Sequence, residues 1–118
     1  MVSKLNAAEI ARLFLRWANI PIEIPKDMDA LRRRRGKLGI ADFDGPEMVF
    51  NVRNAVVHPP KRLSDVEWPS ADELFETWQL ATWYLELSIL RVLDYRGEYR
   101  SRLRLTGWKN ATEMVPWV

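Results

Sequence analysis

Residues 70–93, SADELFETWQLATWYLELSILRVL, form the longest stretch of helical periodicity in the chain. Ser70 and Glu73 have the spacing of a capping box, in which two side chains bond to backbone N–H groups of the first turn. Apolar residues then recur every three or four positions, and one stripe of them is Leu74, Trp78, Ala81 and Leu85. Because apolar residues cover most of its circumference, this helix is expected to lie centrally or to pack against another subunit. Trp78 and Trp83 fall inside the pattern, so both are expected in the core rather than stacked on bases.

Two shorter stretches upstream begin with the same capping spacing. Asn6 opens a predicted helix over residues 6–18, and Asp44 opens another over residues 44–57. Their apolar faces are Ile10, Leu13, Phe14 and Trp17 in the first, and Met48, Val49, Val52, Ala55 and Val56 in the second. With a short basic helix near residues 28–37, these elements predict an all-α antiparallel bundle of about four helices.

The composition bounds the class of protein. At 118 residues the chain is long enough for one hydrophobic core, so residues 1–118 are predicted to form a single domain. No apolar run reaches the length of a transmembrane helix and no signal peptide is recognisable, which predicts a cytoplasmic protein without a membrane partner. With no cysteine and a single histidine, neither disulfides, a metal site nor another cofactor is expected. A C-terminal domain of a longer protein would show the same features.

Charge is distributed unevenly along the chain. Residues 1–64 hold 12 Lys and Arg against 7 Asp and Glu, whereas residues 65–118 hold 6 against 9. A basic half fits an anionic partner that binds on one side of the molecule. It fits equally well two halves that attract each other.

The basic half contains four consecutive arginines, Arg32, Arg33, Arg34 and Arg35, within the predicted short helix. One interpretation is a solvated face, which is what charge runs commonly form. The other is a strip that binds RNA phosphates, because the forked guanidinium group matches phosphate oxygens. The run lacks the exposed polar residues between buried ones that a recognition helix shows, which disfavours a helix-turn-helix DNA binder.

Residues 53–58 read RNAVVH and precede a proline pair. Because the residue before proline is pushed out of the α region, the helix is expected to end near His58. Asn54 and His58 are four positions apart and share the polar side of the helix, and the long side chain of Arg53 can reach the same place. A guanidinium, an amide and an imidazole together suit a phosphate. A lone histidine at a helix end can also serve only as a partner of the helix dipole.

The RNAVVH stretch resembles the motif of the HEPN superfamily, which has an Arg, a polar residue that is often Asn, a short gap, and a His at a helix end. The resemblance implies a helical bundle and a metal-independent endoribonuclease that acts on RNA as a homodimer, with Arg53, Asn54 and His58 as site residues. It also implies an alternative, because HEPN-like domains occur as inactive binding or dimerisation modules of defence and toxin–antitoxin systems. An inhibitor or antitoxin protein is then a further candidate partner. Residues 95–118 have no match in the family core.

Cleavage of RNA at its 2′-hydroxyl groups sets requirements that this sequence meets only as a dimer. A general base removes the hydroxyl proton, and a general acid protonates the departing 5′-oxygen. Positive donors are needed near the phosphorus, a role for Arg53. One histidine cannot easily be base and acid at once, so a two-fold dimer that brings two copies of His58 together is expected.

The last segment of the chain has an ambiguous pattern. Residues 95–99 are compatible with a further short helix after the break at Gly97, whereas residues 100–105 alternate polar and apolar side chains, as an edge strand does. We predict an irregular C-terminal tail. Val115, Trp117 and Val118 are strongly apolar, and they are expected to dock on the bundle.

Overall fold

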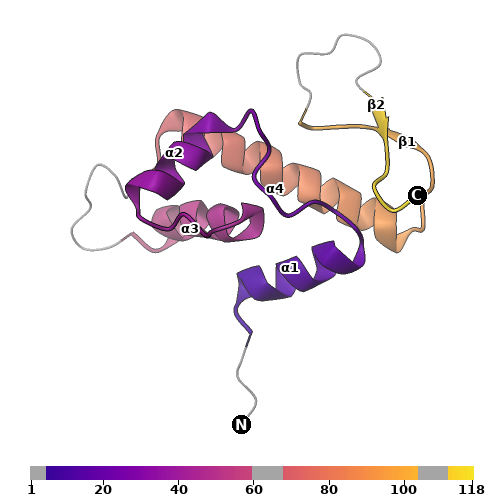
Figure 1. Ribbon diagram of the computed structural model, residues 1–118, viewed down its shortest axis with the longest axis horizontal. Helices are drawn as coiled ribbons and strands as arrows, with labels where there is room; N and C mark the ends of the chain where they lie inside the picture. Colours follow the sequence, from indigo (N-terminus) through magenta and orange to yellow (C-terminus); the bar gives the residue numbers. More distant parts are fainter. Residues whose placement is uncertain (1–4, 60–67, 104–111) are drawn as a thin grey trace.

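The computed structural model describes residues 5–59, 68–103 and 112–118. Within these ranges the chain forms the helices α1 (Ala7–Trp17), α2 (Asp29–Lys37), α3 (Gly45–Val57) and α4 (Ala71–Val92), and the strands β1 (Glu98–Arg100) and β2 (Thr112–Met114). The helix α3 packs against α1 and α4, and α2 packs against α4 (Figure 1). The predicted fold class, a mostly helical domain of four helices, is confirmed. In the described ranges no helix is long and apolar enough to span a membrane.

The predicted caps begin three of the helices. The Asn6 side chain accepts a hydrogen bond from the Glu9 N–H at 2.9 Å, and the Glu9 carboxylate accepts one from the Asn6 N–H at 3.3 Å. These two bonds complete a capping box at the start of α1. Asp44 and Ser70 each accept a bond from the backbone N–H three residues further on, at 3.1 and 3.2 Å. The starts of α1, α3 and α4 are therefore encoded locally.

The first turn of α2 is capped by another helix. Its N-cap residue, Met28, makes no side-chain hydrogen bond. Instead, the carboxylate of Glu76 in α4 accepts bonds from the N–H groups of Ala30 and Leu31, at 3.2 and 3.0 Å. A carboxylate at this place satisfies two backbone donors and interacts favourably with the helix dipole. The start of α2 thus depends on its contact with α4.

The core is one layer of side chains between helices. The molecule measures 47 × 46 × 22 Å, and its short dimension corresponds to about two helix diameters. Trp83 is buried in this core, as predicted. The largest fully buried side chains include Leu31, Met48, Val52, Leu80, Leu87 and Val115.

The thin shape leaves part of the predicted core on the surface. The helical pattern predicts a buried Trp78, but its side chain is 49% exposed, and Leu85 on the same face is exposed too. Val56, predicted in the buried stripe of α3, is also exposed. A helix in a two-layer molecule buries one side only, and α4 carries apolar residues on more than one side. The side of α4 that faces the core is that of Leu80, Trp83, Tyr84 and Leu87.

The first helix also exposes most of its predicted apolar face. The apolar face predicted from its periodicity contains Ile10, Leu13 and Trp17, and all three are more than half exposed. The fourth, Phe14, is half-buried and packs against the core as predicted. The fully buried positions are Leu15 and, just after the helix, Ala18. Periodicity locates an apolar face, but the packing of neighbouring helices decides whether that face is covered.

The C-terminal tail is more regular than predicted. Strands β1 and β2 pair antiparallel, with Glu98 opposite Met114 and Arg100 opposite Thr112. The strand predicted over residues 100–105 is therefore wrong in its bounds, since Arg100 is the last residue of β1, and residues 104 and 105 lie outside the described ranges. The partner of β1 lies more than ten residues later in the chain, so the local alternation of polar and apolar residues does not reveal this pairing.

A buried hydrogen-bond chain fixes the hairpin to α4. The indole N–H of Trp83 donates to the Tyr99 hydroxyl at 2.9 Å, and this hydroxyl donates to the Glu113 carboxylate. Burial and the bond to Glu113 raise the pKa of Tyr99 to about 12. Val115 is buried and Trp117 packs against the core, which confirms their predicted docking, whereas Val118 is exposed.

Gly45 begins α3 at a point where no side chain fits. Its N–H donates to the Ile22 carbonyl at 2.7 Å. A Cβ atom on Gly45 would collide with the Tyr84 hydroxyl and come within 2.9 Å of the Ile22 carbonyl oxygen. Among the described residues the buried Tyr84 hydroxyl has no hydrogen-bond partner, and burial raises its pKa above the usual value. The connector before α2, the start of α3 and the middle of α4 meet here without spare room.

We predict that Gly45→Ala lowers the free energy of unfolding by about 1–3 kcal/mol, the usual effect of overpacking. In the double variant Gly45→Ala with Tyr84→Phe, the colliding hydroxyl is removed, and part of the lost stability should be recovered. The control is Gly36→Ala in α2, where a Cβ meets nothing within 4 Å, and which should stabilise by about 0.5–1 kcal/mol. Urea denaturation followed by circular dichroism measures all four proteins, and equal effects at Gly45 and Gly36 would contradict the steric explanation.

Candidate functional site

The RNAVVH residues end α3 as predicted. The helix stops at Val57, and His58 is its C-cap with φ −126° and ψ 65°, outside the helical region. The His58 N–H still donates to the Asn54 carbonyl at 2.8 Å. The side chains of Arg53, Asn54 and His58 are all exposed. The motif therefore faces away from the core, in agreement with its predicted position on the polar side.

Arg53 and Asn54 are held together by a hydrogen bond. The guanidinium Nη1 of Arg53 donates to Oδ1 of Asn54 at 3.0 Å. Because Arg53 and His58 are five positions apart, they point about 140° away from each other around the helix axis. Within one chain they consequently do not meet, and Asn54 lies between them.

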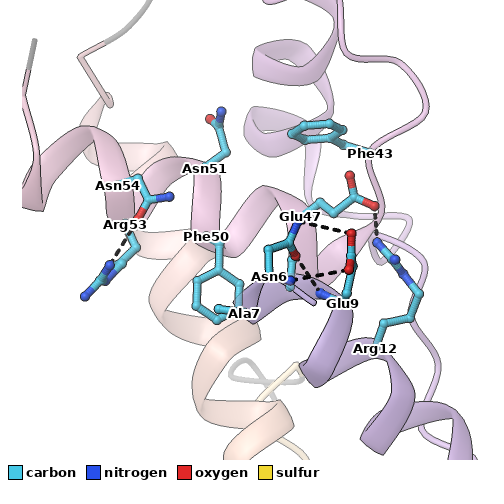
Figure 2. Close-up of a pocket in the computed structure, with 11 residues that line it drawn as sticks. Asn6, Ala7, Glu9, Arg12, Phe43, Glu47, Phe50, Asn51, Arg53 and Asn54 are labelled. Atoms are coloured by element: carbon cyan, nitrogen blue, oxygen red, sulfur yellow. Dashed lines mark hydrogen bonds and ion pairs between the residues drawn. The ribbon is translucent and has the colours of Figure 1, made fainter. Parts of the chain in front are cut away.

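Two depressions flank this part of α3. The Arg53 side chain lines a groove of 640 Å³ between the start of α1 and one side of α3 (Figure 2). The His58 side chain lines a second depression of 410 Å³, which is formed by residues of α2 and α3. Asn51 and Asn54 line both. The structure thus gives the motif two adjoining concave surfaces rather than one closed pocket.

The four arginines of α2 do not form one exposed strip, which corrects the interpretation of Arg32 to Arg35 as a single RNA-binding surface. Arg34 is 2% exposed, and it donates to the Asn51 side chain and to the Glu73 carboxylate, each at 2.9 Å. It stands three residues after the buried Leu31, on the inner side of α2. The spacing of three residues between Leu31 and Arg34 is present in the sequence. The run of four arginines around Arg34 makes its position on the inner side hard to recognise.

The remaining three arginines have different surroundings. Arg33 is exposed. Arg32 is exposed as well, and it donates to the Ile24 carbonyl at 2.9 Å. Arg35 is half-buried and donates to the Phe43 carbonyl at 2.9 Å. A role in RNA binding stays a prediction for these three.

Arg34 also lines the depression that contains His58. Its guanidinium is buried beneath the surface and paired with the Glu73 carboxylate, so it contributes a buried ion pair beneath the floor of this depression. The sequence does not predict that Arg34 lies near His58, because Arg34 reaches this place from a different helix.

The other end of the groove is closed by an ionic cluster. Arg12 of α1 donates to the Asp44 carboxylate at 2.6 Å and is also paired with Glu47. The bond to Asp44 raises the pKa of Arg12. Burial and the nearby Asp44 carboxylate raise the pKa of Glu47, while Arg12 opposes this. Sequence reasoning missed this cluster, and also the half-buried Phe50 that lines the groove beside Arg53, because no local signal joins α1 to α3.

Comparisons with known proteins give one family and one curated relative. A family model described as the YopA C-terminal domain matches residues 1–114. The chain is 35% identical over 113 residues to the SPbeta prophage-derived uncharacterized protein YopA of Bacillus subtilis (strain 168). This match covers 96% of the chain but 24% of the relative, so the chain spans about a quarter of that protein's length. No solved structure matches the chain.

We predict that Arg34→Ala lowers the free energy of unfolding by about 3 kcal/mol, because it leaves the carboxylate of Glu73 and the amide of Asn51 without their partner. Arg33→Ala, on the exposed side of the same helix, is the matched control and should leave stability unchanged within error. Chemical denaturation of both variants measures the difference. Similar stability of the two variants would mean that Arg34 is not a structural residue.

Proposed function

The chain belongs to the YopA C-terminal domain family, and we propose that this member is a metal-independent endoribonuclease of HEPN type that cleaves RNA by attack of a 2′-hydroxyl group. The observation that carries the proposal is the exposure of Arg53, Asn54 and His58 together at the end of α3. The resemblance of RNAVVH to the HEPN motif supplies the chemistry, and a mostly helical domain supports it. RNA as the substrate makes the cytoplasm the proposed location.

In the proposed reaction one His58 imidazole accepts the proton of the 2′-hydroxyl, and the 2′-oxygen attacks the adjacent phosphorus. The bond from phosphorus to the 5′-oxygen breaks, and a second imidazole, protonated, gives its proton to that oxygen. Arg53 stabilises the charge that develops on the phosphoryl oxygens. The products are a 2′,3′-cyclic phosphate and a free 5′-hydroxyl.

This reaction requires a homodimer, because each chain holds one histidine. Val56 and Val57 lie inside the motif and are 42% and 50% exposed. A two-fold contact that covers these two side chains would bring both motifs to one groove. Exposed valines at this position support a composite site made of two subunits.

An alternative function is that of a catalytically inactive helical module for binding or dimerisation in a defence or toxin–antitoxin system, with an inhibitor or antitoxin protein as a candidate partner. The observation that favours it is the exposed apolar surface of α1 and α4. Monomeric proteins rarely expose large apolar patches, which commonly mark protein-binding surfaces. Exposed members of this surface are Leu13, Trp17, Trp78, Leu85, Ile89 and Val92.

The two functions differ in what His58→Ala does. An enzyme should lose activity almost to background, because each general acid or base contributes about a hundredfold to ten-thousandfold. Arg53→Ala should lose about a hundredfold to a thousandfold through lost charge stabilisation. The measurement is cleavage of labelled RNA in the absence of divalent metal, with detection of 2′,3′-cyclic phosphate ends. Arg96→Ala, an exposed arginine outside the motif, is the control and should keep full activity.

Mixing the His58→Ala variant with the wild-type protein tests the composite site. A heterodimer holds one His58 and therefore lacks either the general base or the general acid, so an excess of the variant should suppress the wild-type activity, and sedimentation should show both proteins as dimers. Intact RNA after incubation with the wild-type protein, with and without metal, would reject the nuclease in favour of the binding module.

The exposed part of α2 has its own test. We predict that Arg33→Glu weakens RNA binding, since an arginine that contacts a phosphate contributes electrostatically. For single-stranded RNA the slope of log affinity against log salt should become shallower by about 0.7 for one lost phosphate contact. Arg16→Glu, an equal charge change on the exposed side of α1, is the matched control. Equal affinities of the two variants for RNA would indicate that Arg33 belongs to a solvated face without a role in RNA binding.

A further inference from the structure

The groove beside Arg53 contains an aromatic side chain that the proposed chemistry does not use. Phe50, Arg53 and Asn54 are spaced three and four positions apart, so they share one side of α3. Figure 2 shows Phe50 and Arg53 projecting from neighbouring turns, with the start of α1 at the edge of the groove. An aromatic ring beside a guanidinium is the arrangement with which proteins bind single-stranded nucleic acid, because bases stack on the ring while cations hold the backbone.

Phe50 differs from the other phenylalanine of the groove. Phe43 packs against the core cluster of the described residues. Phe50 is half-buried and lies outside that cluster, with one side toward the groove. Its position is therefore not explained by core packing.

The charges of the groove separate an acidic end from a positive end. At the end formed by α1, Glu47 is paired with Arg12, and the negatively charged Glu9 carboxylate accepts bonds from the neutral amide and the N–H of Asn6. At the other end Arg53 is exposed, and it is bonded to the neutral side chain of Asn54. The acidic end repels a phosphate and leaves this end to an uncharged base, and a phosphate suits the end of Arg53.

Two amide groups that line the same groove as Phe50 have a defined orientation. Arginine only donates hydrogen bonds, so the atoms of Asn51 and Asn54 that face Arg34 and Arg53 must be their carbonyl oxygens. Each amide therefore has its NH2 group left to donate. A ligand between them must offer acceptors, which the exocyclic carbonyl groups of uracil, guanine and cytosine do and the exocyclic amino group of adenine does not.

We propose that this groove is a nucleobase subsite, in which Phe50 stacks on one base of the RNA while Asn51 and Asn54 donate to its carbonyl oxygen and Arg53 holds the adjacent phosphate. A base with an exocyclic carbonyl group, such as uracil, is preferred over adenine. The inference rests on the proposed function, which makes RNA the ligand of this surface. It adds a preference for the base, which the roles of Arg53 and His58 in the proposed cleavage do not supply.

The test measures binding apart from cleavage. Fluorescence anisotropy with the His58→Ala protein and a labelled oligouridylate avoids turnover of the probe. In that protein Phe50→Leu, which keeps an apolar side chain but removes the aromatic face, should weaken binding about tenfold to a hundredfold. Phe50→Trp should bind as the parent or more tightly, and the salt dependence should not change, because no phosphate contact is lost. The control Phe75→Leu alters an exposed aromatic of α4 and should have no effect.

Oligoadenylate of the same length tests the amide donors, and it should bind more weakly than oligouridylate. Unchanged affinity of Phe50→Leu, in a protein whose wild type cleaves RNA, would overturn the subsite and leave the nuclease standing. Equal affinity for the two oligonucleotides would overturn the assignment of Asn51 and Asn54. Base-selective binding that depends on Phe50, in a protein that cleaves no RNA, would support the subsite while the nuclease proposal fails.

Discussion

The packing of three helices depends on one buried guanidinium. Arg34 leaves α2 and is bonded to Asn51 of α3 and to Glu73 of α4, and it is almost fully excluded from water. A buried charge without partners is strongly unfavourable, so these helices have to meet where both partners can reach it. The carboxylate of Glu76 adds a second tie by capping α2 from α4. The short and strongly basic α2 therefore belongs to the framework of the domain.

The same tie shapes the candidate site. By bonding Asn51, Arg34 fixes the side of α3 that lies between the two depressions, and it forms part of the floor next to His58. On the opposite side, the cluster of Arg12 with Asp44 and Glu47 joins α1 to the start of α3. The exposed motif residues thus stand on a helix that is held from both sides, and the proposed cleavage would require such precise positioning.

The thinness of the molecule links its surface to its assembly. About two helix layers can bury one side of each helix, which leaves apolar side chains such as Trp17, Trp78 and Leu85 exposed. Arg91 lies over the Trp17 ring, 4.2 Å from its centre, and covers only part of this surface. A dimer through Val56 and Val57 and a protein partner on the exposed apolar residues of α1 and α4 would cover different residues.

The sequence by itself determined the helices, the caps at Asn6, Asp44 and Ser70, and the end of α3 at His58. These features depend on hydrogen bonds and steric preferences within a few residues. Only the tertiary structure decided that Arg34 is buried, that Trp78 is exposed, and that Phe50 lies beside Arg53 in a groove completed by α1. Periodicity defines the faces of a helix, but the neighbours that cover a face come from distant parts of the chain, and their contacts leave no mark on the local pattern.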